Sequence, residues 1–205
     1  MNSRGFTLKI LAGCLLAILI DLFPAPAPAT ASAVVLMYHR FGERDFPSTN
    51  ITIKQLESHI AELTSDKYTV LPLVDIITKL KTGQPLPDRT IGLSIDDGYK
   101  SIYTTAWPRL KKAGLPFTVF LATKHIDKNS SRHLSWDQIR EMQKAGGVNF
   151  GHHTVSHLHM PTAKAGRISL EITKAHKRFK AELGIRPTLF AYPYGEASLS
   201  VISTI

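Results

Sequence analysis

Two short stretches of this sequence carry residues whose types and spacing suit metal chemistry. Residues 94–98 read SIDDG, and residues 151–157 read GHHTVSH. His153 and His157 are four residues apart, so on a helical turn their imidazoles would share one face and could hold one ion. A carboxylate is available from Asp96 or Asp97. Two imidazoles and one carboxylate make a three-ligand site with open positions, which is typical of catalytic rather than structural metal sites.

The two aspartates can divide the work, because adjacent side chains leaving a strand point in opposite directions. One can bind the ion while the other faces the substrate and accepts a proton from water, whose pKa a bound Zn²⁺ lowers towards about 7. The alternative is a pair of solvated loops, since Asp-Asp-Gly is a common turn and a single histidine is more often a surface or core residue. The position of both stretches in the fold decides between these readings.

The elements that must position these residues follow from the apolar pattern. Apolar runs indicate strands, and segments with helical spacing or capping boxes (Thr52 with Gln55, Ser135 with Gln138) indicate helices. The expected strands are 34–38, 68–73, 91–95, 116–122, 148–151 and 188–192, and the expected helices are 52–65, 74–82, 101–113, 135–145 and 163–183. This alternation predicts an α/β fold with a parallel sheet.

Polar segments follow three of these strands directly. Asp96 and Asp97 follow 91–95, the histidines follow 148–151, and the residues Tyr192-Pro193-Tyr194-Gly195 close the last strand. The active residues of such sheets lie on loops beyond the carboxyl ends of the strands, so the three segments should converge on one face. This convergence favours a site over solvated loops.

The amino-terminal segment predicts export. Residues 1–33 contain basic residues, an apolar run and the triplet Ala31-Ser32-Ala33, in the order of a secretory signal peptide. Cleavage after Ala33 would leave a mature chain, 34–205, without cysteine and without a membrane-spanning segment. A lipoprotein signal at Cys14 is the less favoured alternative, because the apolar run lies mostly after that residue. The net charge of +9 comes from scattered residues, so nucleic acid is not expected as a partner.

The motifs also resemble those of a known family, the polysaccharide deacetylases of the NodB-homology type. Residues 94–98 resemble its Thr/Ser-Phe-Asp-Asp-Gly motif, and residues 152–157 (HHTVSH) resemble its His-Ser/Thr-x-x-x-His motif. Residues 191–195 (AYPYG) resemble its Arg-Pro-Pro-Tyr-Gly motif, and LMYHRF (36–41) resembles the start of one exported branch. The resemblance covers most of residues 34–205, with the main motifs within 88–205.

This resemblance implies a distorted (β/α) barrel and a metal-dependent removal of N-acetyl groups from an N-acetylglucosamine-containing glycan. It implies that Asp96 is the general base and that Asp97, His153 and His157 are the metal ligands. The backbone N–H of Tyr194 would stabilise the oxyanion. The ion would be Zn²⁺, with Co²⁺ or Ni²⁺ as alternatives that share such ligands.

Two departures from the family pattern favour a second hypothesis. The arginine of the third motif is Ala191 here, with Arg186 nearby but out of register, and the late motifs that supply the general acid have no counterpart before Ile205. We therefore expect a barrel that is incomplete at its C-terminus, with an exposed sheet edge. The alternatives are a non-catalytic metal- or glycan-binding remnant and, with less support, a metallo-phosphohydrolase.

Overall fold

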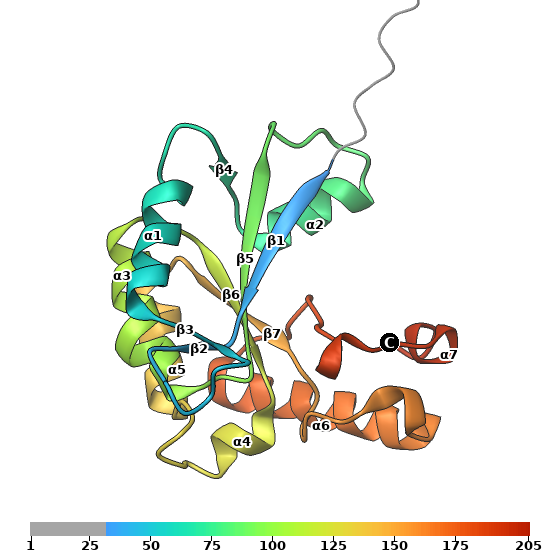
Figure 1. Ribbon diagram of the computed structural model, residues 1–205. Helices are drawn as coiled ribbons and strands as arrows, with labels where there is room; N and C mark the ends of the chain where they lie inside the picture. The colour runs from blue at the N-terminus through green and yellow to red at the C-terminus, as the bar shows by residue number, and fades with distance from the viewer. Residues whose placement is uncertain (1–31) are drawn as a thin grey trace, which may run out of the picture. The chain divides into compact units, whose positions relative to one another are not determined.

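A computed structural model describes residues 32–205, which form an α/β unit built on one parallel sheet (Figure 1). The predicted signal peptide lies outside the described residues except for Ser32 and Ala33, and β1 begins at Ala33 itself. The strands of the sheet are β1 (Ala33–Tyr38), β4 (Thr69–Val70), β5 (Thr90–Asp96), β6 (Phe117–Leu121) and β7 (Val148–His152). They lie in the order β1-β5-β6-β7, with β4 also paired to β5, and every pair is parallel.

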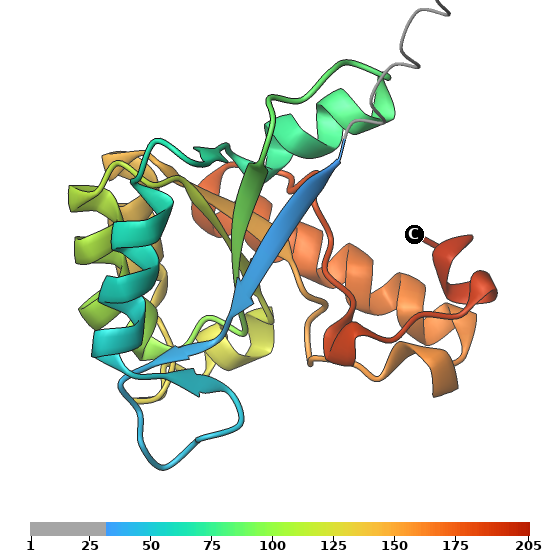
Figure 2. The same ribbon diagram turned by 45° about the horizontal axis from the view of Figure 1, so that its top comes forward.

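Helices follow the strands, as the apolar pattern predicts. They are α1 (Ile53–Leu63), α2 (Leu73–Lys81), α3 (Trp107–Lys112), α4 (Thr123–Asp127), α5 (Trp136–Ala145), α6 (Ala165–Leu183) and α7 (Leu199–Ile202). The capping boxes at the starts of α1 and α5 are both present. Figures 1 and 2 show α1, α3 and α5 side by side on one flank of the sheet, whereas α6 runs past the end of β7. None of the helices of residues 32–205 is long and apolar enough to cross a membrane.

Strand β5 is the centre of the core. All seven of its residues are buried, and Ile95 and its neighbour Val119 on β6 are fully inaccessible. A strand covered on both faces is typical of a parallel sheet packed between helices. The core therefore holds β5 rigidly up to Asp96, its last residue.

The sheet does not close into a complete barrel within residues 32–205, in agreement with the expected incomplete barrel. β1 pairs with β5 on one side only, and three apolar side chains of this edge strand are exposed, namely Val34, Val35 and Met37. An unpaired strand edge of this kind favours association with other chains. The predicted edge is therefore present in the part of the chain that the structure describes.

The prediction of a strand over 188–192 was wrong in extent. This segment forms one isolated parallel bridge, between His152 and Phe190, with hydrogen bonds from His152 N to Leu189 O and from Ala191 N to His152 O. Pro187 and Pro193 bracket the segment and lack the N–H groups that a longer ladder needs. The segment still extends along β7 far enough to bring Ala191 to the end of that strand.

Several shorter elements were not expected, the helix α4 among them. Residues 102–106 form a π-helical turn, η1 (Ile102–Ala106), ahead of α3. The turns η2 (Met160–Thr162) and η3 (Pro193–Gly195) are 3₁₀ helices on either side of α6. A second, two-stranded sheet pairs β2 (Arg40–Phe41) with β3 (Asn50–Ile51) just beyond β1.

Candidate active site

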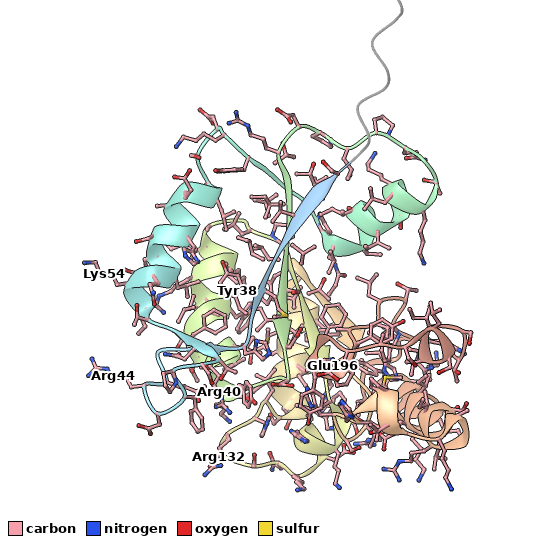
Figure 3. All side chains as sticks on the ribbon, turned by 45° about the vertical axis from the view of Figure 1, so that its right-hand side comes forward. Tyr38, Arg40, Arg44, Lys54, Arg132 and Glu196 are labelled. Atoms are coloured by element: carbon pink, nitrogen blue, oxygen red, sulfur yellow. The ribbon has the colours of Figure 1, made fainter. Side chains whose placement is uncertain are left out.

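The three predicted polar segments converge at the carboxyl ends of the strands. They line one cavity of about 700 Å³. Its walls include Asp96 and Asp97 after β5, His153 and His157 after β7, and Ala191, Tyr192, Tyr194 and Gly195 from the segment beside β7. The convergence expected from the parallel sheet is therefore present in the structure. In Figure 3 the labelled Arg40 and Glu196 lie on opposite sides of this end of the sheet.

Asp97, His153 and His157 have the separations that a metal site requires. Asp97 Oδ1 lies 3.6 Å from His153 Nε2 and 3.3 Å from His157 Nε2, and one donor atom from each residue lies within 4.8 Å of the others. Two ligands that each lie about 2.0–2.1 Å from a tetrahedral Zn²⁺ are roughly 3.3 Å apart. The N₂O donor set and its spacing therefore fit a divalent ion such as Zn²⁺.

The protonation of His153 is set by the backbone. His153 Nδ1 lies 2.9 Å from the carbonyl oxygen of Ala191, which can only accept a hydrogen bond. Nδ1 must therefore carry the proton, and the lone pair of Nε2 is directed towards Asp97 and His157. Burial is the main cause that lowers the pKa of His153 to about 4, so this imidazole is neutral, as a ligand must be.

The histidine pair does not lie on a helical turn, contrary to the prediction. Residues 153–157 form an irregular turn in which Thr154 (φ 63°) and His157 (φ 57°) are both left-handed. Left-handed conformations are uncommon for residues other than glycine and need support from their surroundings. The imidazoles still converge, because the turn folds back on itself, and their ring centroids are 4.8 Å apart.

Asp96 and Asp97 occupy different environments although they are neighbours. Asp96 is the last residue of β5 and is 6% exposed, and its Oδ1 has no hydrogen-bond partner in the described part of the chain. Burial, followed by the charge of Asp97, raises the pKa of Asp96 to about 7. A carboxyl group poised near neutral pH is suited to accept a proton, whereas Asp97 faces the two imidazoles.

The turn after β5 requires glycine at position 98. Gly98 has φ 73°, and a Cβ there would lie 2.9 Å from Leu121 Cδ2 and 3.0 Å from Ile126 Cδ1. Asp97 itself is left-handed, with φ 70°. Consecutive left-handed residues reverse the chain immediately after Asp96, and this reversal turns the Asp97 side chain towards the histidines.

Tyr194 also adopts a strained conformation at the cavity. Its φ is 64°, its side chain is 63% exposed, and its ring lies edge-on to that of His157 with 4.5 Å between centroids. Bulky residues with positive φ are rare and concentrate at functional sites. A hydrogen bond between His159 Nε2 and Glu196 Oε2, 2.7 Å apart, holds the segment that bears Tyr194.

Two further histidines line the cavity, and the sequence did not predict either of them as part of the site. His39 follows β1, and His125 lies on α4. Burial is the main cause that lowers the pKa of both imidazoles. His125 Nδ1 lies 3.4 Å from His133 Nε2. In the sequence, only the position of His39 directly after a predicted strand indicated that one of these two histidines could lie at the site.

The position of the family arginine is filled by an alanine that cannot supply a charge. Ala191 lines the cavity, and Arg186 does not. The charge of Arg186 instead helps to lower the pKa of His176. The buried cation next to the site is Arg40, whose guanidinium lies 3.4 Å from the ring centroid of Tyr99, a residue that lines the cavity. The sequence contained no local signal for this arrangement, which joins β2 to the loop after β5.

The chain is similar to known proteins in sequence and in fold. A family model described as polysaccharide deacetylase matches residues 83–205. The chain is 28% identical over 190 residues to a poly-beta-1,6-N-acetyl-D-glucosamine N-deacetylase of Staphylococcus aureus (strain MSSA476), covering 80% of this chain and 65% of that protein. It is 27% identical over 165 residues to the protein YxkH of Bacillus subtilis (strain 168), covering 80% and 57%. The chain thus spans less than two thirds of the length of these relatives.

Solved structures show the same fold. The deacetylase PplD of Streptococcus pyogenes, in complex with acetate, has a TM-score of 0.78 at 20% identity, over 86% of this chain and 80% of that one. IcaB from Ammonifex degensii has a TM-score of 0.74 at 25% identity, over 85% and 79%. These similarities agree with the α/β architecture derived above.

Proposed function

The chain belongs to the polysaccharide deacetylase family, and on that premise we propose that it is a metal-dependent hydrolase of N-acetylated glycans. The reaction removes N-acetyl groups from an N-acetylglucosamine-containing polysaccharide or oligosaccharide and releases acetate. The observation that carries this proposal is the convergence of Asp97, His153 and His157 beside the buried Asp96 in one cavity. The name of the staphylococcal relative supports a β-1,6-linked polymer as the first substrate to test.

Asp97, His153 and His157 would hold the ion. When bound, a divalent ion supplies Lewis-acid activation of the acetamide carbonyl and of water. Zn²⁺ is the first choice for two imidazoles and one carboxylate, and Co²⁺ or Ni²⁺ can take the same ligands. The neutral His153, oriented by the Ala191 carbonyl, is prepared for this role before any ion arrives.

Asp96 would act as the general base. Its carboxylate takes a proton from the attacking water as the new C–O bond forms at the acetyl carbon. The backbone N–H of Tyr194 would donate a hydrogen bond to the developing oxyanion, an interaction worth a few kcal/mol in comparable sites. Cleavage of the C–N bond then needs a proton on the amine, and His39 lies in the cavity where it could donate one. The products are acetate and a free amino sugar.

We further propose that the protein is exported by the signal peptide in residues 1–33 and acts on glycan outside the cytoplasm. Residues 34–205 would then form the deacetylase domain. Finding Val34 as the amino-terminal residue of the secreted protein by Edman degradation would support this boundary.

Acetate release from defined oligomers tests the proposed activity. The purified full chain would be incubated with β-1,6- and β-1,4-linked N-acetylglucosamine oligomers, with Zn²⁺ or with a chelator. We expect metal-dependent release that His153→Ala abolishes and that the matched control His59→Ala leaves intact, because His59 lies on α1 and contacts Tyr38 outside the cavity. If the folded, metal-loaded protein binds the oligomers and releases no acetate, the alternative of a non-catalytic glycan-binding protein is supported instead.

A further inference from the structure

The loop between the two histidine ligands is under strain and is held from outside. Thr154 and His157 are left-handed, and each such residue costs of order 1 kcal/mol. The backbone of this loop sets how far apart the Cα atoms of His153 and His157 lie. Whatever fixes the loop therefore controls the geometry of the proposed metal site.

A buried carboxylate on α6 provides that support. Glu171 is 4% exposed, and its Oε2 accepts hydrogen bonds from the backbone N–H groups of Val155 (2.9 Å) and Ser156 (2.8 Å). Its Oε1 accepts from Ser156 Oγ (3.0 Å) and from Arg167 (2.6 Å), which lies one helical turn earlier. Three of these four bonds end on the two residues midway between His153 and His157.

We propose that Glu171 is a positioning residue that sets the separation of His153 and His157 and thereby the affinity and coordination geometry of the metal site. The inference rests on the proposed metal site of the deacetylase. Groups that hydrogen-bond to metal ligands or orient them typically change metal affinity 10- to 100-fold when mutated. Glu171 would affect metal affinity indirectly, because it binds the peptide groups between the two ligands and not the ligands themselves.

The chemistry of the four bonds explains why a carboxylate is needed at this position. Every partner is a donor, and an ionised carboxylate accepts at both oxygens. In one orientation a glutamine would turn its NH₂ group against the two backbone N–H groups and lose both of those bonds. In the other it would lose the bond to Arg167, and its neutral oxygen would bind the two backbone N–H groups less strongly than a carboxylate does.

The test measures Zn²⁺ binding to metal-free protein by titration calorimetry, comparing wild type with Glu171→Gln. We expect the variant to bind Zn²⁺ 10- to 100-fold more weakly and the visible spectrum of its Co²⁺ form to change, because that spectrum reports ligand geometry. The matched control is Glu182→Gln on the same helix, which removes ion pairs to Arg140 and Arg178 and leaves the loop untouched. Its Zn²⁺ affinity should stay within twofold of wild type.

The outcomes separate the two proposals. A wild-type protein that binds no Zn²⁺ would refute the metal site and this inference together. Wild-type binding with an unchanged affinity and Co²⁺ spectrum in folded Glu171→Gln would overturn the role of Glu171 alone. If Glu171→Gln fails to fold, Ser156→Ala removes only the Oγ bond. That variant should weaken binding several-fold, and an unchanged affinity there would overturn the inference.

Discussion

Replacing the proposed base, Asp96→Asn, should stabilise the metal-free protein and strongly lower the activity of the metal-loaded protein. Burial and the charge of Asp97 raise the pKa of Asp96 from 3.8 to about 7. Between these values the folded state binds the proton more tightly than the unfolded state does, so folding takes up a proton. The stability of the wild type therefore falls as pH rises through this window. Asparagine resembles the neutral acid and does not titrate, so the variant does not lose stability over this pH range.

The size of the effect follows from the shift. A displacement of about three pH units at about 1.4 kcal/mol each gives an upper bound of about 4 kcal/mol above pH 7. The carboxyl group borders an open cavity, so water reduces the gain to roughly 2–3 kcal/mol. At pH values well below 3.8 the side chain is neutral in the folded and unfolded states of both proteins, and their unfolding free energies should agree.

Urea unfolding of metal-free wild type and Asp96→Asn at pH 4, 5.5 and 8 measures this difference. A stability difference that does not grow with pH would refute the reasoning about burial. The activity of the variant should fall 10²- to 10⁴-fold, the usual contribution of a general base, with Zn²⁺ affinity within a few-fold of wild type. Loss of Zn²⁺ binding together with turnover would show that Asp96 is a ligand rather than the base.

Three further predictions follow from single positions. Gly98→Ala should destabilise the protein by about 2–4 kcal/mol in urea unfolding, since positive φ and overpacking both contribute. The control Gly83→Ala, with positive φ and nothing within 4 Å of the added Cβ, should lose about 1 kcal/mol of stability. Equal losses in the two variants would disprove the clash of a Cβ at position 98 with Leu121 and Ile126. Val34→Lys at the exposed edge of β1 should reduce self-association measured by light scattering more than Leu80→Lys on α2 does. His39→Ala should lower kcat about 10²-fold or more at unchanged Zn²⁺ affinity, and a full kcat would exclude it as the proton donor.

The features that could be predicted from the sequence are those encoded within a few residues. The capping boxes at Thr52 and Ser135, the buried run ending at Asp96 and the histidine stretch after β7 are local patterns, and the structure contains each of them. Parallel topology then required the strand ends to meet. The residue types at those ends were therefore enough to predict where the site lies.

The contacts that support the site could not be predicted, because they join segments distant in the chain. Glu171 reaches Val155 across 16 residues only because α6 packs against β7. Arg40 reaches Tyr99 because β1 and β5 are neighbours. The turn conformation of residues 153–157 depends on such contacts, and a spacing of four residues was wrongly read as helical for that reason.

The different roles proposed for Asp96, as base, and Asp97, as metal ligand, depend on a single turn. β5 carries Asp96 into the core to the point where its carboxyl group is desolvated, and the left-handed residues Asp97 and Gly98 then reverse the chain at once. One more residue of strand would point the Asp97 side chain to the face of the sheet opposite that of Asp96. With the reversal, Asp97 is directed towards the imidazoles of His153 and His157, where a cation would offset its charge. Two identical side chains can therefore supply a ligand and a base because the backbone separates their environments within one peptide bond.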